Sequence, residues 1–159
     1  MFGLLFPKVI DNRYRGQWLA LLLFVPVLII KMLMGFNFAG LNPLVETRDI
    51  LIDVDGVPLD SYSVEAATDL LFFANAWGLC LFTITVFGVI ALIRYRAAIP
   101  LAILLLAIEQ VGRKAMSVAE SGLGLNWPMS MAGMINWGLT IALVLALVLS
   151  IIRRRSAAD

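Results

Sequence analysis

The sequence predicts an all-α membrane protein: a four-transmembrane-helix up-down bundle in one domain, with a short extracytoplasmic β-hairpin or ordered loop. Two observations support this class. Of the 159 residues 62% are hydrophobic and only 14% are charged, with a mean hydropathy of +0.96, whereas a soluble domain of this size needs more polar surface. The apolar residues also fall into four long stretches, and basic residues gather between them.

The first two spans are expected at residues 16–36 and 64–94. The first contains Pro26, which membrane helices tolerate because neighbouring groups satisfy the freed backbone. Its apolar run is longer than the core of a signal peptide, so we interpret it as a retained span. The second contains an uncharged run over residues 70–93, which is long enough for a hydrocarbon core of ~30 Å. The helix is expected to start near Ser63, and the stretch DSYS, residues 60–63, supplies side chains that can cap its first turn.

The third and fourth spans are expected at residues 98–118 and 128–152. Each begins near a proline, Pro100 and Pro128, at the helix position where proline is best accommodated. The short interval before Pro100 predicts a tight turn after the second span, so that consecutive helices run in opposite directions.

The basic residues predict the orientation of these spans. Eight of the twelve lie on one side of a four-span chain: Lys8, Arg13, Arg15, Arg94, Arg96, Arg153, Arg154 and Arg155. The opposite loop and the start of the second span carry seven acids and Arg48 alone. The positive-inside rule therefore places both termini in the cytoplasm. Short loops and terminal arginines favour a bacterial inner membrane.

The outer loop, residues 37–63, contains the dipeptide Asp55-Gly56, which is a strong signal for a hairpin turn. Val54 and Val57 would flank the turn, and Pro58 would restrict the second strand to a sheet edge. We therefore expect a small hairpin or ordered flap here. The same DVDG stretch has only part of a calcium-loop pattern and lacks the glutamate at position twelve, so no metal site is predicted.

Charged residues inside the third span provide the only candidate site. Glu109 and Arg113 are four residues apart and share a helix face, where they can pair. At about 1.5 Å per residue, polar groups of the other spans reach a similar height. The expected polar layer consists of Glu109, Arg113, Gln110, Lys31, Asn75 and Asn136. Such a layer is either structural glue between helices, a site for an ion or ligand, or a contact for partner helices.

Composition excludes several classes of function. The chain has no histidine and a single cysteine, Cys80, inside an apolar run, which removes imidazole ligands, histidine-assisted nucleophiles and an internal disulfide. A net charge of +1 gives no nucleic-acid signal. Neither a nucleotide-binding glycine loop nor a hydrolase motif is present. No catalytic residue, cofactor or metal is predicted.

Three functions remain open. The first is a non-catalytic accessory or scaffold subunit, in contact with the lipid bilayer and with other membrane subunits or a homo-oligomer. The second is an oligomeric carrier or channel that uses the polar layer for a small ion or anionic ligand. The third is a lipid-acting intramembrane enzyme with Glu109 as base and Arg113 or Lys114 as phosphate clamp.

Overall fold

The computed structural model describes residues 2–7, 9–121 and 131–152. The chain divides into two compact units. Unit 1 consists of Met1–Leu28 and Val86–Asp159, and unit 2 consists of Ile29–Thr85. Pro128, expected at the start of the fourth span, and the terminal arginines Arg153, Arg154 and Arg155 lie outside the described residues.

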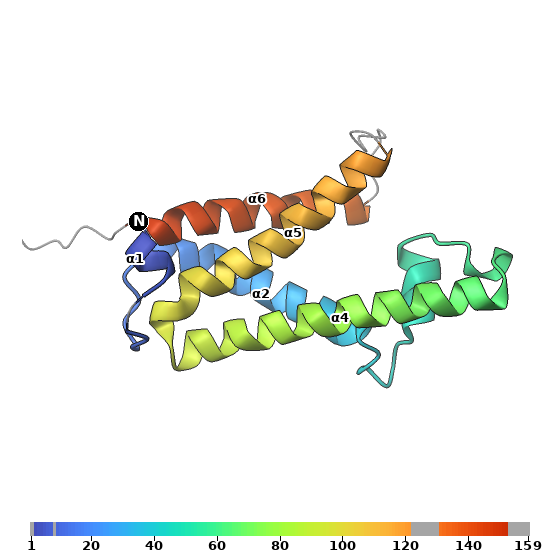
Figure 1. Cartoon of the computed structure of the whole chain (residues 1–159), viewed down its shortest axis with the longest axis horizontal. Helices are drawn as coiled ribbons and strands as arrows, with labels where there is room; N and C mark the ends of the chain where they lie inside the picture. The colour runs from blue at the N-terminus through green and yellow to red at the C-terminus, as the bar shows by residue number, and fades with distance from the viewer. Residues whose placement is uncertain (1, 8, 122–130, 153–159) are drawn as a thin grey trace, which may run out of the picture. The chain divides into compact units, whose positions relative to one another are not determined.

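Regular structure in the described residues is entirely helical. Among the described residues, three helices are long and apolar enough to cross a membrane: α2 (Trp18–Phe38), α4 (Val64–Ile93) and α6 (Met131–Ile151), the last through its residues 133–151. A fourth long helix, α5 (Ile99–Ser121), is less apolar and does not belong to this group. Figure 1 shows these helices along the chain.

The helix starts follow the expected chemistry. Ser63 accepts a hydrogen bond from the backbone N–H of Ala66 at 3.2 Å, which caps α4 as predicted. Pro100 lies in the first turn of α5, after a short 3₁₀ turn, η3 (Arg96–Ala98). Pro26 lies inside α2 without ending it.

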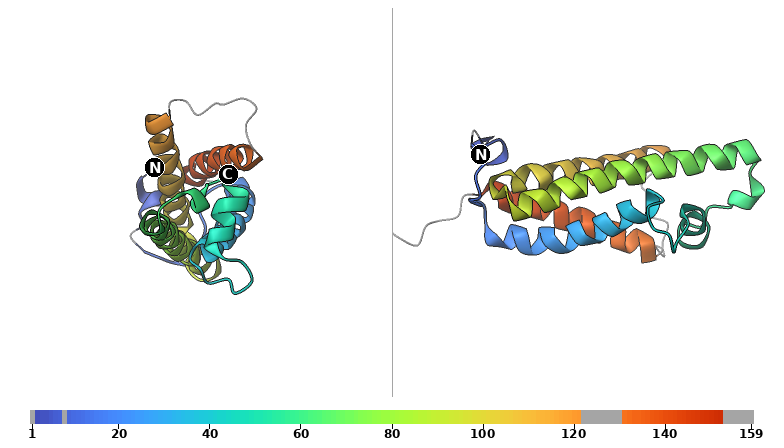
Figure 2. Two further views of the ribbon diagram at one scale, coloured as in Figure 1. Left: turned by 90° about the vertical axis from the view of Figure 1, so that its right-hand side faces the viewer. Right: turned by 90° about the horizontal axis from the view of Figure 1, so that it is seen from below.

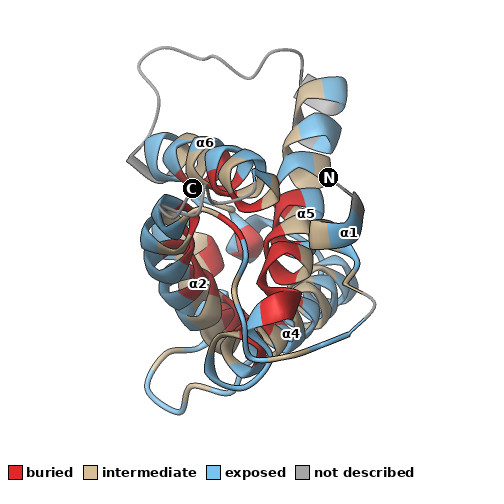
Figure 3. Cartoon of the chain, turned by 90° about the vertical axis from the view of Figure 1, so that its left-hand side faces the viewer, coloured by how far each residue is buried: buried red, intermediate tan, exposed pale blue. Residues whose placement is uncertain are grey.

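Unit 1 contains α1 (Phe2–Leu5), the first half of α2, the end of α4, and α5 and α6. Buried residues recur along α5 and α6 at intervals of three or four, as one face of a helix requires. They are Ile99, Ala102, Ile103, Leu106 and Gln110 on α5, and Leu139, Leu143, Ala146 and Ser150 on α6. Figure 3 shows these buried positions on the inward sides of the two helices.

At one end of unit 1, the segment before α2 is tied to two other helices (Figure 1). The N–H of Gln17 donates to the carbonyl of Leu149 at 3.3 Å, and the N–H of Ala97 donates to the carbonyl of Asp11 at 3.1 Å. Helix α1 packs against α5 and α6 at this end. We call it the basic end, because Arg13, Arg15, Arg94 and Arg96 lie there.

Unit 2 contains a small folded loop between α2 and α4. It consists of α3 (Thr47–Asp49), a π-helical turn η1 (Ile50–Val54) and a 3₁₀ turn η2 (Leu59–Ser61). Leu51 and Leu59 form an apolar core with Phe38, whose ring meets that of Trp77 on α4 edge-on at 5.0 Å. These turns lie beside the first turns of α4 (Figure 2). At ~1.5 Å per residue α4 exceeds a ~30 Å hydrocarbon core, so its first turns are free to pack on the loop.

The expected hairpin is wrong, because no strand occurs in the outer loop, residues 37–63. Gly56 does adopt a left-handed conformation, with φ of 70°. It ends η1 instead of joining two strands: the N–H of Val57 donates to the carbonyl of Leu51 at 2.8 Å. A left-handed glycine serves a helix C-terminus as well as a hairpin turn. Burial of Leu51 against Phe38 favours the helical alternative, and the loop is the ordered one that the sequence also allowed.

Two glycines in unit 2 allow α2 and α4 to approach closely. A Cβ at Gly78 would overlap the backbone of Phe38 and Ala39, and one at Gly35 would lie 2.6 Å from the backbone nitrogen of Phe82. In unit 1, Gly88 of α4 similarly receives the side chain of Leu28. Gly138 is suited by sequence to the same role, but a methyl group added there would meet no described atom within 4 Å.

We expect Gly78→Ala to lower the free energy of unfolding by about 1–3 kcal/mol, because backbone atoms cannot move aside for the new methyl group. Gly138→Ala is the matched control. It adds the same methyl to a helix with open space around it, and should be neutral or stabilising by up to about 1 kcal/mol. Unfolding in mixed detergent micelles measures both changes. Equal effects of the two substitutions would show that the close approach at Gly78 is wrong.

Candidate functional site

A group of polar side chains joins α5 to α6 within unit 1. Gln110 has no exposed surface, and its Nε2 donates to two acceptors on α6. These are the carbonyl oxygen of Asn136 and the hydroxyl of Thr140, each at 3.0 Å. The hydroxyl of Thr140 in turn donates to the same carbonyl at 2.8 Å. One buried amide therefore bridges the two helices.

Arg113 extends this contact on the same face of α5. Its Nε lies 3.2 Å from Oε1 of Glu109, which is the ion pair that the four-residue spacing predicted. Its Nη2 donates to Oε1 of Gln110 at 2.9 Å and to Oδ1 of Asn136 at 3.4 Å. The side chain of Glu109 is 13% exposed and that of Arg113 is 37% exposed. We call Glu109, Gln110, Arg113, Asn136 and Thr140 the α5–α6 polar network.

Lys114 takes no part in the hydrogen bonds of this network. Its Nζ lies 5.1 Å from the ring centroid of Trp137 on α6, within the range of a cation–π interaction. Successive residues of an α-helix are rotated by about 100°, so Lys114 and Arg113 lie on different sides of α5. The Lys114 charge lies over an aromatic ring of the neighbouring helix.

The α5–α6 polar network contains the kind of hydrogen bonds that hold two helices together. Its guanidinium, amide and hydroxyl donors bond to carboxylate, amide, hydroxyl and backbone oxygens of the same network. In the described part of the chain, no buried side-chain N or O atom lacks a hydrogen-bond partner. Among those residues no cluster of three or more histidine, cysteine or acidic side chains is arranged to hold a metal ion. Apolar residues surround the network, where satisfied polar groups hold helices together.

Lys31 and Asn75, the remaining members of the expected layer, belong to unit 2. Lys31 lies in α2 and has no exposed surface. Asn75 is exposed on α4 and lines an open pocket in the folded loop, together with Asn42, Thr47 and Arg48. The structure thus brings together Glu109, Gln110, Arg113 and Asn136, and the single layer shared by all six residues stays a prediction.

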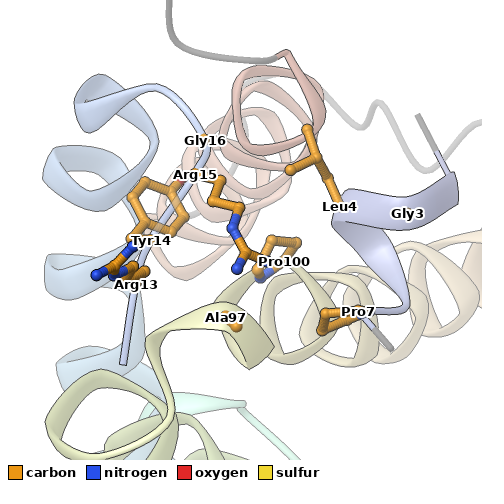
Figure 4. A pocket seen from close by; sticks show the side chains of 9 residues that line it. All are labelled: Gly3, Leu4, Pro7, Arg13, Tyr14, Arg15, Gly16, Ala97 and Pro100. Carbon is orange, nitrogen blue, oxygen red and sulfur yellow. The ribbon is translucent and has the colours of Figure 1, made fainter. Parts of the chain in front are cut away.

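A second feature, at the basic end of unit 1, was not predicted as a site. It is a pocket lined by Gly3, Leu4, Pro7, Arg13, Tyr14, Arg15, Gly16, Ala97 and Pro100 (Figure 4). The cavity has a volume of about 10 Å³, which is room for roughly one water molecule. The only sequence signal was Arg13 and Arg15 before an apolar run, which indicates orientation and carries no information about a pocket.

Tyr14 is half-buried in the wall of this basic-end pocket. Its hydroxyl donates to the carbonyl of Gln17 at 3.1 Å. Burial disfavours the charged phenolate and raises the pKa of Tyr14 from 10.0 to about 12. The phenol therefore remains a neutral donor and adds no negative charge beside Arg13 and Arg15.

No known family model, curated protein or solved structure matches this chain. Its function is therefore inferred from the chemistry of the α5–α6 polar network and of the basic-end pocket.

We expect Thr140→Val to lower the free energy of unfolding by about 0.5–1.5 kcal/mol, because it removes an acceptor of the buried Gln110 amide. The matched control is Thr83→Val, since the hydroxyl of Thr83 is exposed and donates only to the carbonyl of Leu79 on its own helix. Detergent-titrated unfolding compares the two. A Thr140→Val protein as stable as Thr83→Val would exclude a stabilising role for the network at this position.

The raised pKa of Tyr14 predicts a pH dependence of stability. Between pH 10 and about 12 the folded protein holds a proton that the unfolded chain has lost, so stability should fall as the pH rises through this range. Tyr14→Phe should remove this part of the slope. Subtracting the phenolate absorbance of folded Tyr14→Phe from that of folded wild type isolates the titration of Tyr14. Its midpoint should lie near pH 12. A midpoint near 10 in folded protein would contradict the burial of Tyr14.

Proposed function

We propose that this chain is a small multi-pass membrane protein with a non-catalytic role, as an accessory or scaffold subunit of a membrane complex. In this proposal α2, α4, α5 and α6 all span the bilayer in alternating directions. The membrane is a bacterial inner membrane with both termini in the cytoplasm. Lipid and other membrane subunits, or further copies of this chain, surround the helices.

The observation that carries the proposal is the internal use of the α5–α6 polar network. Gln110 and Arg113 donate to oxygens of Asn136, Thr140 and Glu109 at 2.9–3.4 Å. A binding or catalytic site needs polar groups directed at a ligand. Here these groups are directed at the neighbouring helix, which favours a structural role for the most polar part of α5.

The exposed surface of α5 supports its membrane location. Leu105, Ile108 and Val111 are 37%, 60% and 42% exposed, on the side of the helix away from Leu106 and Gln110. A helix whose outer side is apolar and whose inner side is polar suits lipid or a partner helix better than water. Pairing of Glu109 with Arg113 reduces the cost of placing charged residues in this span.

The basic end supports the proposed orientation. Arg13, Arg15, Arg94 and Arg96 occupy the segments that enter α2 and connect α4 with α5. The folded loop of unit 2 instead exposes acids that include Asp49, Asp53, Asp55 and Asp60. Basic residues are retained on the cytoplasmic side of bacterial membranes, which favours an extracytoplasmic location for the folded loop.

A second candidate is an oligomeric carrier or channel for a small ion or anionic ligand. The observation in its favour is the burial of ionisable residues within helices expected to span the membrane: Lys31 is 0% exposed and the Glu109 side chain is 13% exposed. Such residues are costly within a bilayer and commonly mark ion pathways.

Transport by reconstituted protein separates the two candidates. We expect proteoliposomes containing the wild-type chain to give no ion or small-anion flux above empty liposomes. Mild-detergent extracts should contain the chain in a complex of fixed stoichiometry, larger than its 17.5 kDa. Glu109→Gln should lower stability only, by about 1 kcal/mol, because an i,i+4 pair is weak.

Flux by the wild-type protein that Glu109→Gln or Lys31→Ala abolishes would overturn the accessory role and establish the carrier. Thr83→Val serves as the control in this assay. The hydroxyl of Thr83 is exposed on α4, and residue 83 is far in the sequence from both Lys31 and Glu109. A strictly monomeric chain in native membranes, as well as in detergent, would also contradict the accessory role.

A further inference from the structure

Two arginines line the basic-end pocket, and one of them is balanced by a carboxylate. In Figure 4, Arg15 extends toward Pro100, whereas Arg13 lies beside Tyr14. The nearby carboxylate is that of Asp11, whose Oδ2 accepts from Nη2 of Arg15 at 2.7 Å and whose Oδ1 accepts from the backbone N–H of Arg13 at 3.1 Å. Within the described ranges, no carboxylate pairs with the guanidinium of Arg13. The pocket therefore has a net positive charge.

The backbone that carries these arginines is held in place. Asp11 and Gln17, at the two ends of the segment, hydrogen-bond to Ala97 and Leu149. Between them, a Cβ at Gly16 would lie 2.5 Å from the carbonyl oxygen of Ser150, so the chain passes very close to α6. Because both ends are fixed, Arg13 and Arg15 extend from a preorganised segment, which lowers the entropy cost of binding an anion.

In the membrane orientation proposed above, on which this inference rests, exposed apolar residues put the pocket at the level of lipid headgroups. Phe6, Val9 and Ile10 before the pocket segment are 54%, 67% and 58% exposed. Trp18, immediately after it, is 56% exposed, and Ile93 at the end of α4 is 71% exposed. Apolar and tryptophan side chains beside arginines are typical of the membrane–water interface. At this depth the abundant anion is the phosphate of a phospholipid.

We propose that the open mouth of the basic-end pocket binds the phosphate of one anionic phospholipid, with one phosphate oxygen in the space that fits a water molecule. Arg13 and Arg15 donate to the phosphate oxygens, for which the planar guanidinium is well suited. Leu4 and Pro7 form an apolar wall on the other side of the pocket, against the glycerol backbone. The pocket itself is too small for acyl chains, which extend over exposed apolar residues such as Ile93. The proposal does not depend on whether the protein is an accessory subunit or a carrier.

Lipid titration of purified, detergent-solubilised full-length protein tests the proposal, with native mass spectrometry to count bound molecules. The probes are phosphatidylglycerol and phosphatidylcholine with identical acyl chains. We expect one phosphatidylglycerol to bind preferentially. Arg13→Gln and Arg15→Gln should each weaken its binding about tenfold, the usual effect of losing a charge-assisted hydrogen bond. Asp11→Asn should strengthen it, because it removes the competing charge and keeps an Oδ1 acceptor for the Arg13 N–H.

Arg94→Gln is the matched control, since Arg94 is an exposed arginine of the same end that does not line the pocket. It should change phosphatidylglycerol affinity less than twofold. Equal losses in Arg13→Gln, Arg15→Gln and Arg94→Gln would overturn the pocket in favour of diffuse attraction. Equal binding of phosphatidylcholine would overturn the preference for an anionic lipid. Displacement of the lipid by millimolar inorganic phosphate would show a site for the free anion instead.

Discussion

The buried amide of Gln110 is the interaction on which the pairing of α5 and α6 depends. Inside a bilayer a polar side chain finds no water, so its hydrogen bonds must be made within the protein. Gln110 donates to α6 and accepts from Arg113, and this places the guanidinium between Glu109 and Asn136. Leu106 of α5 and Leu143 of α6 are fully buried as well. A helix too polar to rank among the apolar spans is thereby accommodated beside α6.

Helical periodicity made most of the fold predictable. The long apolar runs predicted α2, α4 and α6 to within a few residues, and Ser63 and Pro100 marked two helix starts. The outer loop was less predictable, because Asp55-Gly56 fits a hairpin and a helix C-terminus equally well. What decides between them is the burial of Leu51 and Leu59 on Phe38, and a contact between distant residues is invisible in local sequence.

The candidate site was predictable only where spacing along one helix determines contact. Glu109 and Arg113 were paired from their four-residue separation alone. The partners on α6 were not, because the Asn136 carbonyl is a backbone group and the role of Thr140 depends on the rotation of two helices. The pocket between the segment before α2 and the start of α5 was missed for the same reason. Arginines before an apolar run indicate which side they occupy, and nothing about what faces them.

The two polar regions of unit 1 differ in where their charges are directed. In the α5–α6 polar network, Arg113 is surrounded by Glu109, Gln110 and Asn136 of the chain itself, so its charge stabilises the pairing of helices. At the basic end, Arg13 lies on a segment fixed at both ends and is an exposed residue of the pocket lining. A preorganised cation at the depth of lipid phosphates gains more from binding than an arginine already paired within the protein. The proposed lipid site therefore depends on arginines that the chain leaves exposed, whereas the charges of the α5–α6 polar network contribute to the pairing of the two helices.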